Sequence, residues 1–206
     1  AVSSHSAPSA YNFVPGVMGL ILMLVCSMMT AISIVREKEY GTMELLLVSP
    51  VRPMSVIVSK AVPYLVLSVV NLVTILLLAR WVLDVPMRGS LLLLLLVSVL
   101  FILASLGLGL LISVIASTQK TALLISGMGL TMPTMIFSGI IFPCESMPVI
   151  LQYFSDIIPA KWYIIIVKKL MIEGVGFGYI YQEFLVLLAM TVFLLTVSIG
   201  LFRKRL

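Results

Sequence analysis

Residues 91–115 have the sequence LLLLLLVSVLFILASLGLGLLISVI, which contains no charged side chain. As an α-helix this stretch would be about 38 Å long at 1.5 Å per residue, enough to cross a hydrocarbon core of about 30 Å. A transmembrane β-strand would instead alternate polar and apolar residues over about ten positions. The stretch therefore predicts a membrane-spanning helix, and it decides the fold class.

The rest of the chain repeats this pattern. Of its 206 residues 62% are hydrophobic and 10% are charged, whereas a soluble domain carries about 25% charged residues. Four further charge-free stretches are long enough to span a membrane: 14–35, 61–79, 121–141 and 184–202. We therefore predict an all-α, polytopic transmembrane helical bundle with five spans over residues 13–206. Residues 1–12 are interpreted as the end of an extracytoplasmic region.

Basic residues predict the orientation of the bundle. One side would carry eight of the 13 Lys and Arg residues: Arg36, Lys38, Arg52, Lys60, Lys120, Arg203, Lys204 and Arg205. The other side would carry Arg80, Arg88, Lys161, Lys168 and Lys169. Because Lys and Arg accumulate in cytoplasmic loops, we expect the N-terminus outside and the C-terminus in the cytoplasm. The net charge of +5 is thus explained by topology, and nucleic-acid binding is not predicted.

A few residues within the spans carry further expectations. Pro15 would occupy the first turn of the first helix, where its missing N–H costs nothing. Asn71 is the most polar side chain deep in any predicted span, and it either forms an interhelical hydrogen bond or lines a translocation path. Ser105 and Gly109 form a small-xxx-small pair, which predicts close packing of helix backbones.

Motifs of enzymes and ion-coupled carriers are missing from the sequence. It contains no HExxH, GxSxG, P-loop or Cys/His cluster, so no catalytic or metal-binding residue is predicted. The predicted spans also contain no Asp, Glu or His, which argues against an intramembrane metalloprotease and against a proton-coupled carrier. An apolar bundle remains, whose energy source lies outside this chain.

The first cytoplasmic loop, residues 36–60, has the sequence REKEYGTMELLLVSPVRPMSVIVSK. Gly41 can end the first helix in a left-handed conformation, and Thr42 can cap a new short helix with Glu44 in its first turn. That helix would end at Pro50, and it would carry Met43, Leu46 and Leu47 on one face. Its apolar face could rest on lipid or dock into a partner protein, and the charged residues before it could pair among themselves.

The segment 142–183 before the last span is also unusual. It contains Pro143, Pro148 and Pro159, and its two apolar pieces, 149–154 and 162–172, are too short to cross a membrane. We therefore expect re-entrant or interfacial helices on the outer side.

These two segments resemble one family, the permeases of type-2 ABC transporters. The first loop is similar to the family's signature loop, a charged cluster followed by GT-x-E-x-L-x-x-x-P. The matching residues are Arg36, Glu37, Lys38, Glu39, Gly41, Thr42, Glu44, Leu46 and Pro50, with Lys60 after them. The outer segment resembles the family's re-entrant helices through Ser138-Gly139-Ile140-Ile141-Phe142-Pro143, Glu145-Ser146-Met147-Pro148 and Pro159.

The resemblance implies a permease subunit of an ATP-driven exporter in the inner (plasma) membrane of a prokaryote. The first loop would hold a coupling helix that contacts a separate ABC ATPase, which binds ATP and Mg, and a second permease subunit, identical or similar, would complete the path. The implied coupling residues are Arg36, Glu37, Glu39, Gly41, Thr42, Met43, Glu44, Leu46, Leu47 and Pro50. The implied outer gate comprises Gly139, Phe142, Pro143, Glu145 and Pro148.

The family permease has six spans, and this chain shows five. We interpret the chain as the C-terminal part of such a permease, most similar to the branch with a large extracytoplasmic domain after the first span. Two alternatives stay open at this point. One is a membrane scaffold that anchors a partner without moving cargo, and the other is an intramembrane enzyme, which the absent carboxylates and histidines disfavour.

Overall fold

The computed structural model describes residues 7–42, 48, 53–82, 84, 87–138 and 146–205, and within them every regular element is helical. The long helices are α1 (Ala7–Glu39), α3 (Pro53–Trp81), α4 (Leu91–Ile115), α5 (Gln119–Phe137) and α8 (Tyr181–Arg205). Between α5 and α8 lie α6 (Val149–Asp156), α7 (Pro159–Lys168), the π-helix η2 (Lys169–Glu173) and the 3₁₀ helix η3 (Phe177–Tyr179). The all-α class predicted from the sequence is therefore confirmed.

Four of the described helices are long and apolar enough to cross a membrane: α1, α3, α4 and α8. They contain the predicted ranges 14–35, 61–79, 91–115 and 184–202. A fifth candidate is the pair Val149–Asp156 and Pro159–Glu173, which is bent by 88°. The predicted span 121–141 instead corresponds to α5, which has 19 residues and ends at Phe137. Helix α5 is not among the candidate spans.

The start of α1 differs from the prediction. The helix begins at Ala7, so Pro15 lies inside it rather than in its first turn. Pro8 takes a first-turn position instead, where the missing N–H of a proline has no intrahelical acceptor. An internal proline is tolerated in a helix of this kind because neighbouring helices can satisfy the carbonyl that it frees.

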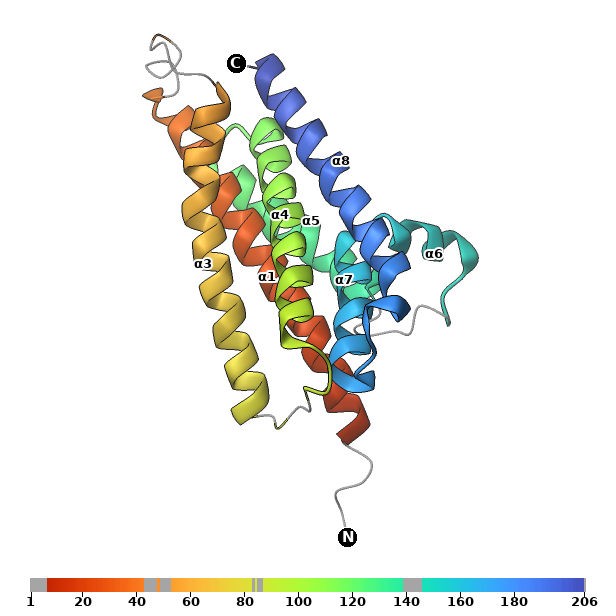
Figure 1. The fold of residues 1–206 in the computed structure, drawn as a ribbon. Coiled ribbons are helices and arrows are strands. Elements are labelled where there is room, and N and C mark those ends of the chain that lie inside the picture. Colours follow the sequence, from red (N-terminus) through yellow and green to blue (C-terminus); the bar gives the residue numbers. More distant parts are fainter. Residues whose placement is uncertain are drawn as a thin grey trace.

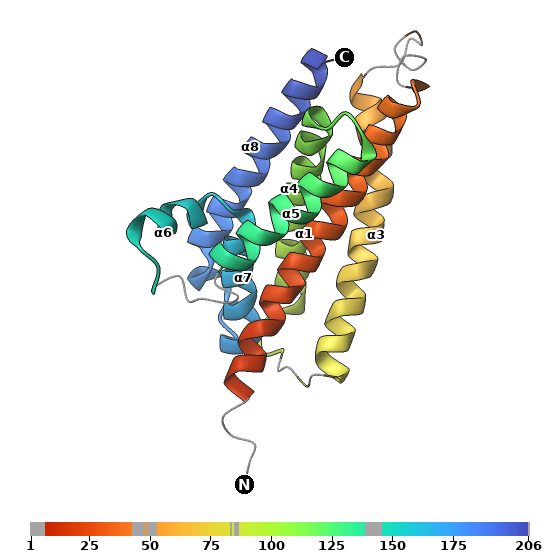
Figure 2. The same cartoon turned by 180° about the vertical axis from the view of Figure 1, so that it is seen from behind.

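The chain between α4 and α8 runs back through the bundle in pieces (Figures 1 and 2). Helix α5 crosses behind α1, α6 projects sideways, and α7 with η2 continues to the end of the bundle at which α8 begins. Helix α7 lies inside the bundle, with Ala160, Tyr163, Ile164 and Ile166 buried against residues of α1 and α4. The ring of Tyr163 stacks on Phe101 with centroids 4.2 Å apart, and its hydroxyl lies 2.8 Å from Ser98 Oγ.

Helix α4 lies at the centre and uses two glycines to approach its neighbours. A Cβ on Gly109 would lie 2.6 Å from the carbonyl oxygen of Ser27 in α1. A Cβ on Gly107 would lie 3.3 Å from Leu194 Cβ in α8, and the Ser198 hydroxyl donates a hydrogen bond of 2.7 Å to the Gly107 carbonyl. Small residues therefore bring the backbones of three helices together, as the sequence predicts for Gly109.

Replacing Gly109 with alanine should destabilise the bundle. The added methyl overlaps the α1 backbone, and overpacking of this kind costs about 1–3 kcal/mol. Gly200→Ala in α8 is the matched control, because a Cβ at that position would have no neighbouring atom within 4 Å. Thermal unfolding in detergent should show a lower Tm for Gly109→Ala and an unchanged or higher Tm for Gly200→Ala. Equal, unlowered Tm values for both variants would contradict the close approach.

Candidate functional site

The end of α1 carries the charged cluster of the first loop, and Gly41 closes the helix. Helix α1 ends at Glu39, and Gly41 has φ +71°, the left-handed conformation expected from the sequence. The Thr42 hydroxyl donates a hydrogen bond of 3.1 Å to the Glu37 carbonyl, so Thr42 satisfies an acceptor at the end of α1. The helix predicted after Thr42, with Met43, Glu44, Leu46, Leu47 and Pro50, lies outside the described residues.

Glu37 and Lys60 join α1 to α3. Their side chains form an ion pair, and both are partly buried, with 20% and 33% of the side-chain surface exposed. A pair that keeps this much contact with water is worth about 1 kcal/mol or less. The pair fixes the two helices that flank the first loop relative to each other.

Lys38 and Glu39 bind the two sides of the turn between α4 and α5. The Lys38 ammonium donates to the carbonyl of Ser113, in the last turn of α4. The Glu39 carboxylate accepts hydrogen bonds from the Gln119 backbone N–H at 3.2 Å and from Gln119 Nε2 at 2.8 Å. Gln119 is the first residue of α5.

The charges of Lys38 and Glu39 are each opposite in sign to the partial charge at the helix end that they contact. The last carbonyls of a helix have no intrahelical donor and carry partial negative charge, which favours the Lys38 cation at the end of α4. The first N–H groups of a helix carry partial positive charge, which favours the Glu39 carboxylate at the start of α5. We call this set of contacts, made by Lys38 and Glu39 to Ser113 and Gln119, the turn clamp.

The sequence prediction of the cluster was therefore incomplete. Glu37 and Glu39 bind groups on other helices, whereas the sequence also allowed pairing within the cluster. Lys38, Lys60 and Gln119 were not chosen as functional residues, although a Thr-Gln pair before an apolar helix is an N-terminal signal that could have marked Gln119. The Arg36 side chain is exposed and has no hydrogen bond or ion pair with the described part of the chain.

Asn71 lies in α3, and its amide Nδ2 is buried without a hydrogen-bond partner among the described residues. Ser68, one turn earlier, is buried as well, and its hydroxyl lies beside the buried Cys26 thiol. An interhelical hydrogen bond from Asn71, which the sequence favoured, is not formed by this nitrogen. Buried polar atoms without partners are uncommon and costly.

Of the predicted outer gate, only Pro148 lies within the described residues; Gly139, Phe142, Pro143 and Glu145 lie outside them. Pro148 precedes α6, and its carbonyl accepts hydrogen bonds from the N–H groups of Leu151 at 2.9 Å and Gln152 at 3.1 Å. The Ser155 hydroxyl donates to the Phe137 carbonyl at 2.5 Å, which holds the end of α6 against the end of α5.

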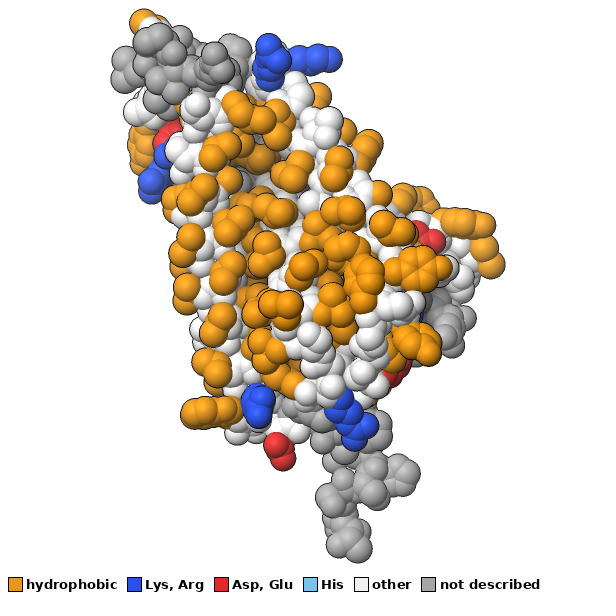
Figure 3. Space-filling view, in the orientation of Figure 1, with side chains coloured by type: hydrophobic (Ala, Val, Ile, Leu, Met, Phe, Trp, Pro, Cys, Tyr) orange, Lys and Arg blue, Asp and Glu red, His pale blue; other side chains and the backbone are white. Residues whose placement is uncertain are grey.

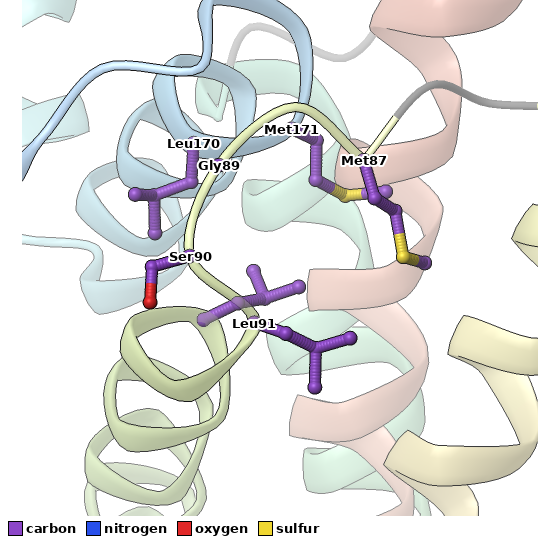
Figure 4. A pocket seen from close by; sticks show the side chains of 7 residues that line it. Met87, Gly89, Ser90, Leu91, Leu170 and Met171 are labelled. Atoms are coloured by element: carbon purple, nitrogen blue, oxygen red, sulfur yellow. The ribbon is translucent and has the colours of Figure 1, made fainter.

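The loop before α4 crosses η2 (Figure 4). A Cβ on Gly89 would lie 2.3 Å from the Leu170 carbonyl, and the Arg88 N–H donates to the Met171 carbonyl at 3.3 Å. The cavity beside this crossing has a volume of about 10 Å³, no more than the ~10–15 Å³ that one water needs. The crossing is a packing contact and leaves no room for a ligand.

No group of three or more His, Cys, Asp or Glu that could hold a metal occurs among the residues that the structure places. The chemistry available at the described ends of the helices is therefore that of ion pairs and hydrogen bonds between helix ends.

Comparison with known proteins gives consistent matches. The sequence pattern of the family described as ABC-2 type transporter matches residues 3–172. The probable multidrug ABC transporter permease YbhS of Escherichia coli (strain K12) is 34% identical over 169 residues, which are 82% of this chain and 45% of that relative. The probable multidrug ABC transporter permease YbhR of the same organism is 31% identical over 192 residues, 93% of this chain and 52% of that relative.

The inner membrane transport permease YhhJ of the same strain is 31% identical over 193 residues, 92% of this chain and 51% of that relative. The chain thus spans about half the length of these curated relatives. No solved structure gives a significant match to the chain.

The turn clamp makes a testable prediction about the start of α5. Glu39→Ala removes the acceptor at the first N–H groups of α5, so amide hydrogen exchange over residues 118–122 should become faster. Arg36→Ala is the matched control, because the Arg36 side chain is an exposed charge of the same cluster without a partner in the described chain. Unchanged exchange at 118–122 in Glu39→Ala would contradict the clamp.

Proposed function

The chain belongs to the ABC-2 type transporter family, and from that membership we propose that it is the membrane part of a permease subunit that exports cargo with the energy of ATP. Permease subunits of this family lack the ATPase domain, so ATP and Mg would be bound by a partner ATPase. A second permease subunit would complete the translocation path. The chain is a multi-pass membrane protein, and the inner membrane of a prokaryote is the proposed location, which the name of its relative YhhJ supports.

The proposed coupling element is the first loop, and the observation that supports it is the set of contacts at the end of α1. Glu37 pairs with Lys60 of α3, Lys38 binds the end of α4, and Glu39 binds the start of α5. A force applied to the residues after Gly41 would thus reach three other helices through adjacent side chains. This is what a loop needs if it is to pass the closing motion of an ATPase into the membrane.

Within that loop the residues divide into two proposed roles. Met43, Glu44, Leu46 and Leu47 would contact the ATPase, with Pro50 ending their helix. Glu37 and Glu39 would instead hold the loop to the bundle, and Gly41 with Thr42 would set the angle at which it leaves α1. Arg36 is exposed and is proposed as a direct contact to the ATPase.

Asn71 is proposed to line the translocation path in another state of the transport cycle. Its buried and unpaired Nδ2 supports this proposal. A helix rearrangement that gives this nitrogen water or a polar cargo group as a partner would recover the cost of leaving it unpaired. The outer gate is proposed to comprise Gly139, Phe142, Pro143, Glu145 and Pro148. The chain bends by 88° between α6 and α7, and this bend supports the proposal because the gate could open by a hinge motion at that point.

The cargo class follows from the relatives and from composition. YbhS and YbhR are named as probable multidrug permeases. We propose amphipathic compounds for this chain also, because the charge-free stretches of its spans would offer a cargo apolar groups and uncharged polar groups.

The proposal predicts that coupling and assembly depend on the loop. Pull-down of the full-length permease from membranes should bring a stoichiometric ATPase with it, and cargo should stimulate the ATPase activity. The double variant Met43→Ala, Glu44→Ala should lower capture or stimulation by about tenfold, as for a central interface residue, while membrane insertion stays intact.

Lys204→Gln is the matched control, an exposed basic residue that lies at the same end of the bundle in α8. A permease that purifies alone, with no ATPase activity at any cargo concentration, would overturn the exporter function and favour a membrane scaffold. Full coupling in the double variant would remove the loop from the mechanism.

A further inference from the structure

An apolar groove lies between α3 and α4 at the end of the bundle where the two helices are joined. It has a volume of about 210 Å³, several times the roughly 30 Å³ that a water molecule takes in the liquid. Val73, Leu76, Leu77 and Arg80 of α3 line one side, and Met87, Leu91 and Leu95 line the other. None of these residues was assigned a function above, and the groove opens to the outside of the bundle.

The groove runs from the membrane surface toward the hydrocarbon. Arg80 and Trp81 end α3, and Trp81 is 82% exposed, as is typical of tryptophans at the headgroup level. Val73 lies seven residues before Arg80, which is about 10 Å deeper at 1.5 Å per residue. The polar end of the groove therefore lies at headgroup depth and its apolar end among the acyl chains. In Figure 3 hydrophobic side chains cover the length of this face, and basic side chains lie at its two ends.

Arg80 is the one charged residue that lines the groove. Its side chain is exposed and forms no ion pair or hydrogen bond with the described residues. Arg88 and Asp84 are the other exposed charged residues of the described loop that follows α3, so the local charge is positive. A guanidinium is well suited to a phosphate because its N–H groups can bind two oxygens at once.

We propose that this groove binds an anionic phospholipid, with one acyl chain between α3 and α4 and the phosphate on Arg80. A lipid is the occupant because the groove offers a site for each part of a phospholipid. Its apolar walls would hold an acyl chain, and the unpaired Arg80 at its polar end would bind the phosphate. The site is independent of the proposed transport function, because it uses neither the first loop nor Asn71.

Photolabelling of the full-length permease in vesicles tests the proposal. The probe is phosphatidylglycerol with a photoactivatable group on its acyl chain, and phosphatidylcholine with the same chain is the zwitterionic comparison. The readout is the yield of lipid adduct at Leu77, measured by mass spectrometry. The matched site is Leu185 in α8, which is 54% exposed against 53% for Leu77 and lies equally far from the outer end of its helix.

We expect phosphatidylglycerol to label Leu77 more strongly than Leu185, and phosphatidylcholine to label both alike. Arg80→Gln should lower phosphatidylglycerol labelling at Leu77 about fivefold, the effect expected for one basic residue at a membrane surface. Arg88→Gln should lower it less than Arg80→Gln does, because Arg88 adds to the local positive charge but does not line the groove. Leu91→Trp should lower labelling by both lipids at Leu77, because the larger side chain fills the groove.

Three results would overturn the site. Equal labelling of Leu77 and Leu185 by phosphatidylglycerol would show only ordinary lipid contact. Labelling that is insensitive to Arg80→Gln would remove the phosphate contact. Absence of lipid adducts at Leu77, with cross-links there to another segment of the permease or to its second copy, would show that protein covers the groove.

Discussion

Two side chains of opposite charge contact the turn between α4 and α5, and they connect the end of α1 to the rest of the bundle. Lys38 binds a carbonyl in the last turn of α4, and Glu39 binds the first N–H of α5. Both helix ends present backbone groups that have no partner within their own helix. Because Lys38 and Glu39 are adjacent in α1, the last turn of α1 supplies a donor to a carbonyl at the end of α4 and an acceptor to an N–H at the start of α5.

This clamp works because α4 is already held close to α1 and α8. Gly109 lets the α1 backbone approach, and Gly107 does the same for α8. The buried hydroxyls of Ser27, Thr30 and Ser105 donate to carbonyls four residues earlier in their own helices, so they need no partner across the interface. Close packing and internally satisfied hydroxyls are what an apolar solvent demands of a helical bundle. The clamp then joins this rigid centre to the first loop.

Much of the fold could be predicted from the sequence, because charge-free stretches of sufficient length have few other structures open to them. The start of α1 and the end of α5 could not. Small residues before residue 14 are compatible with helix and loop alike, so Pro15 was placed in the wrong turn. Helix α5 stops at Phe137, which hydropathy alone does not reveal.

The candidate site was predicted only in part, because its contacts join residues that are far apart in the sequence. The sequence showed that Arg36, Glu37, Lys38 and Glu39 form a charged cluster, but the partners Lys60, Ser113 and Gln119 are up to 80 residues away along the chain. Ser113 takes part through its backbone carbonyl, which any residue type would supply, so no side-chain pattern marks it. Gly41, in contrast, was predicted correctly, because the positive φ that commonly ends a helix strongly favours glycine.

We infer that the ends of α1, α4 and α5 move as one unit when the first loop is displaced. Spin labels at Tyr40 and Lys120, both exposed, would measure the distance across the clamp in the assembled complex, with and without ATP and Mg. Labels at Tyr40 in two permease subunits would confirm that a motion takes place. If these helix ends move together, the distance from Tyr40 to Lys120 stays unchanged while the distance between the subunits changes. A change across the clamp of the same size as the change between subunits would contradict this inference.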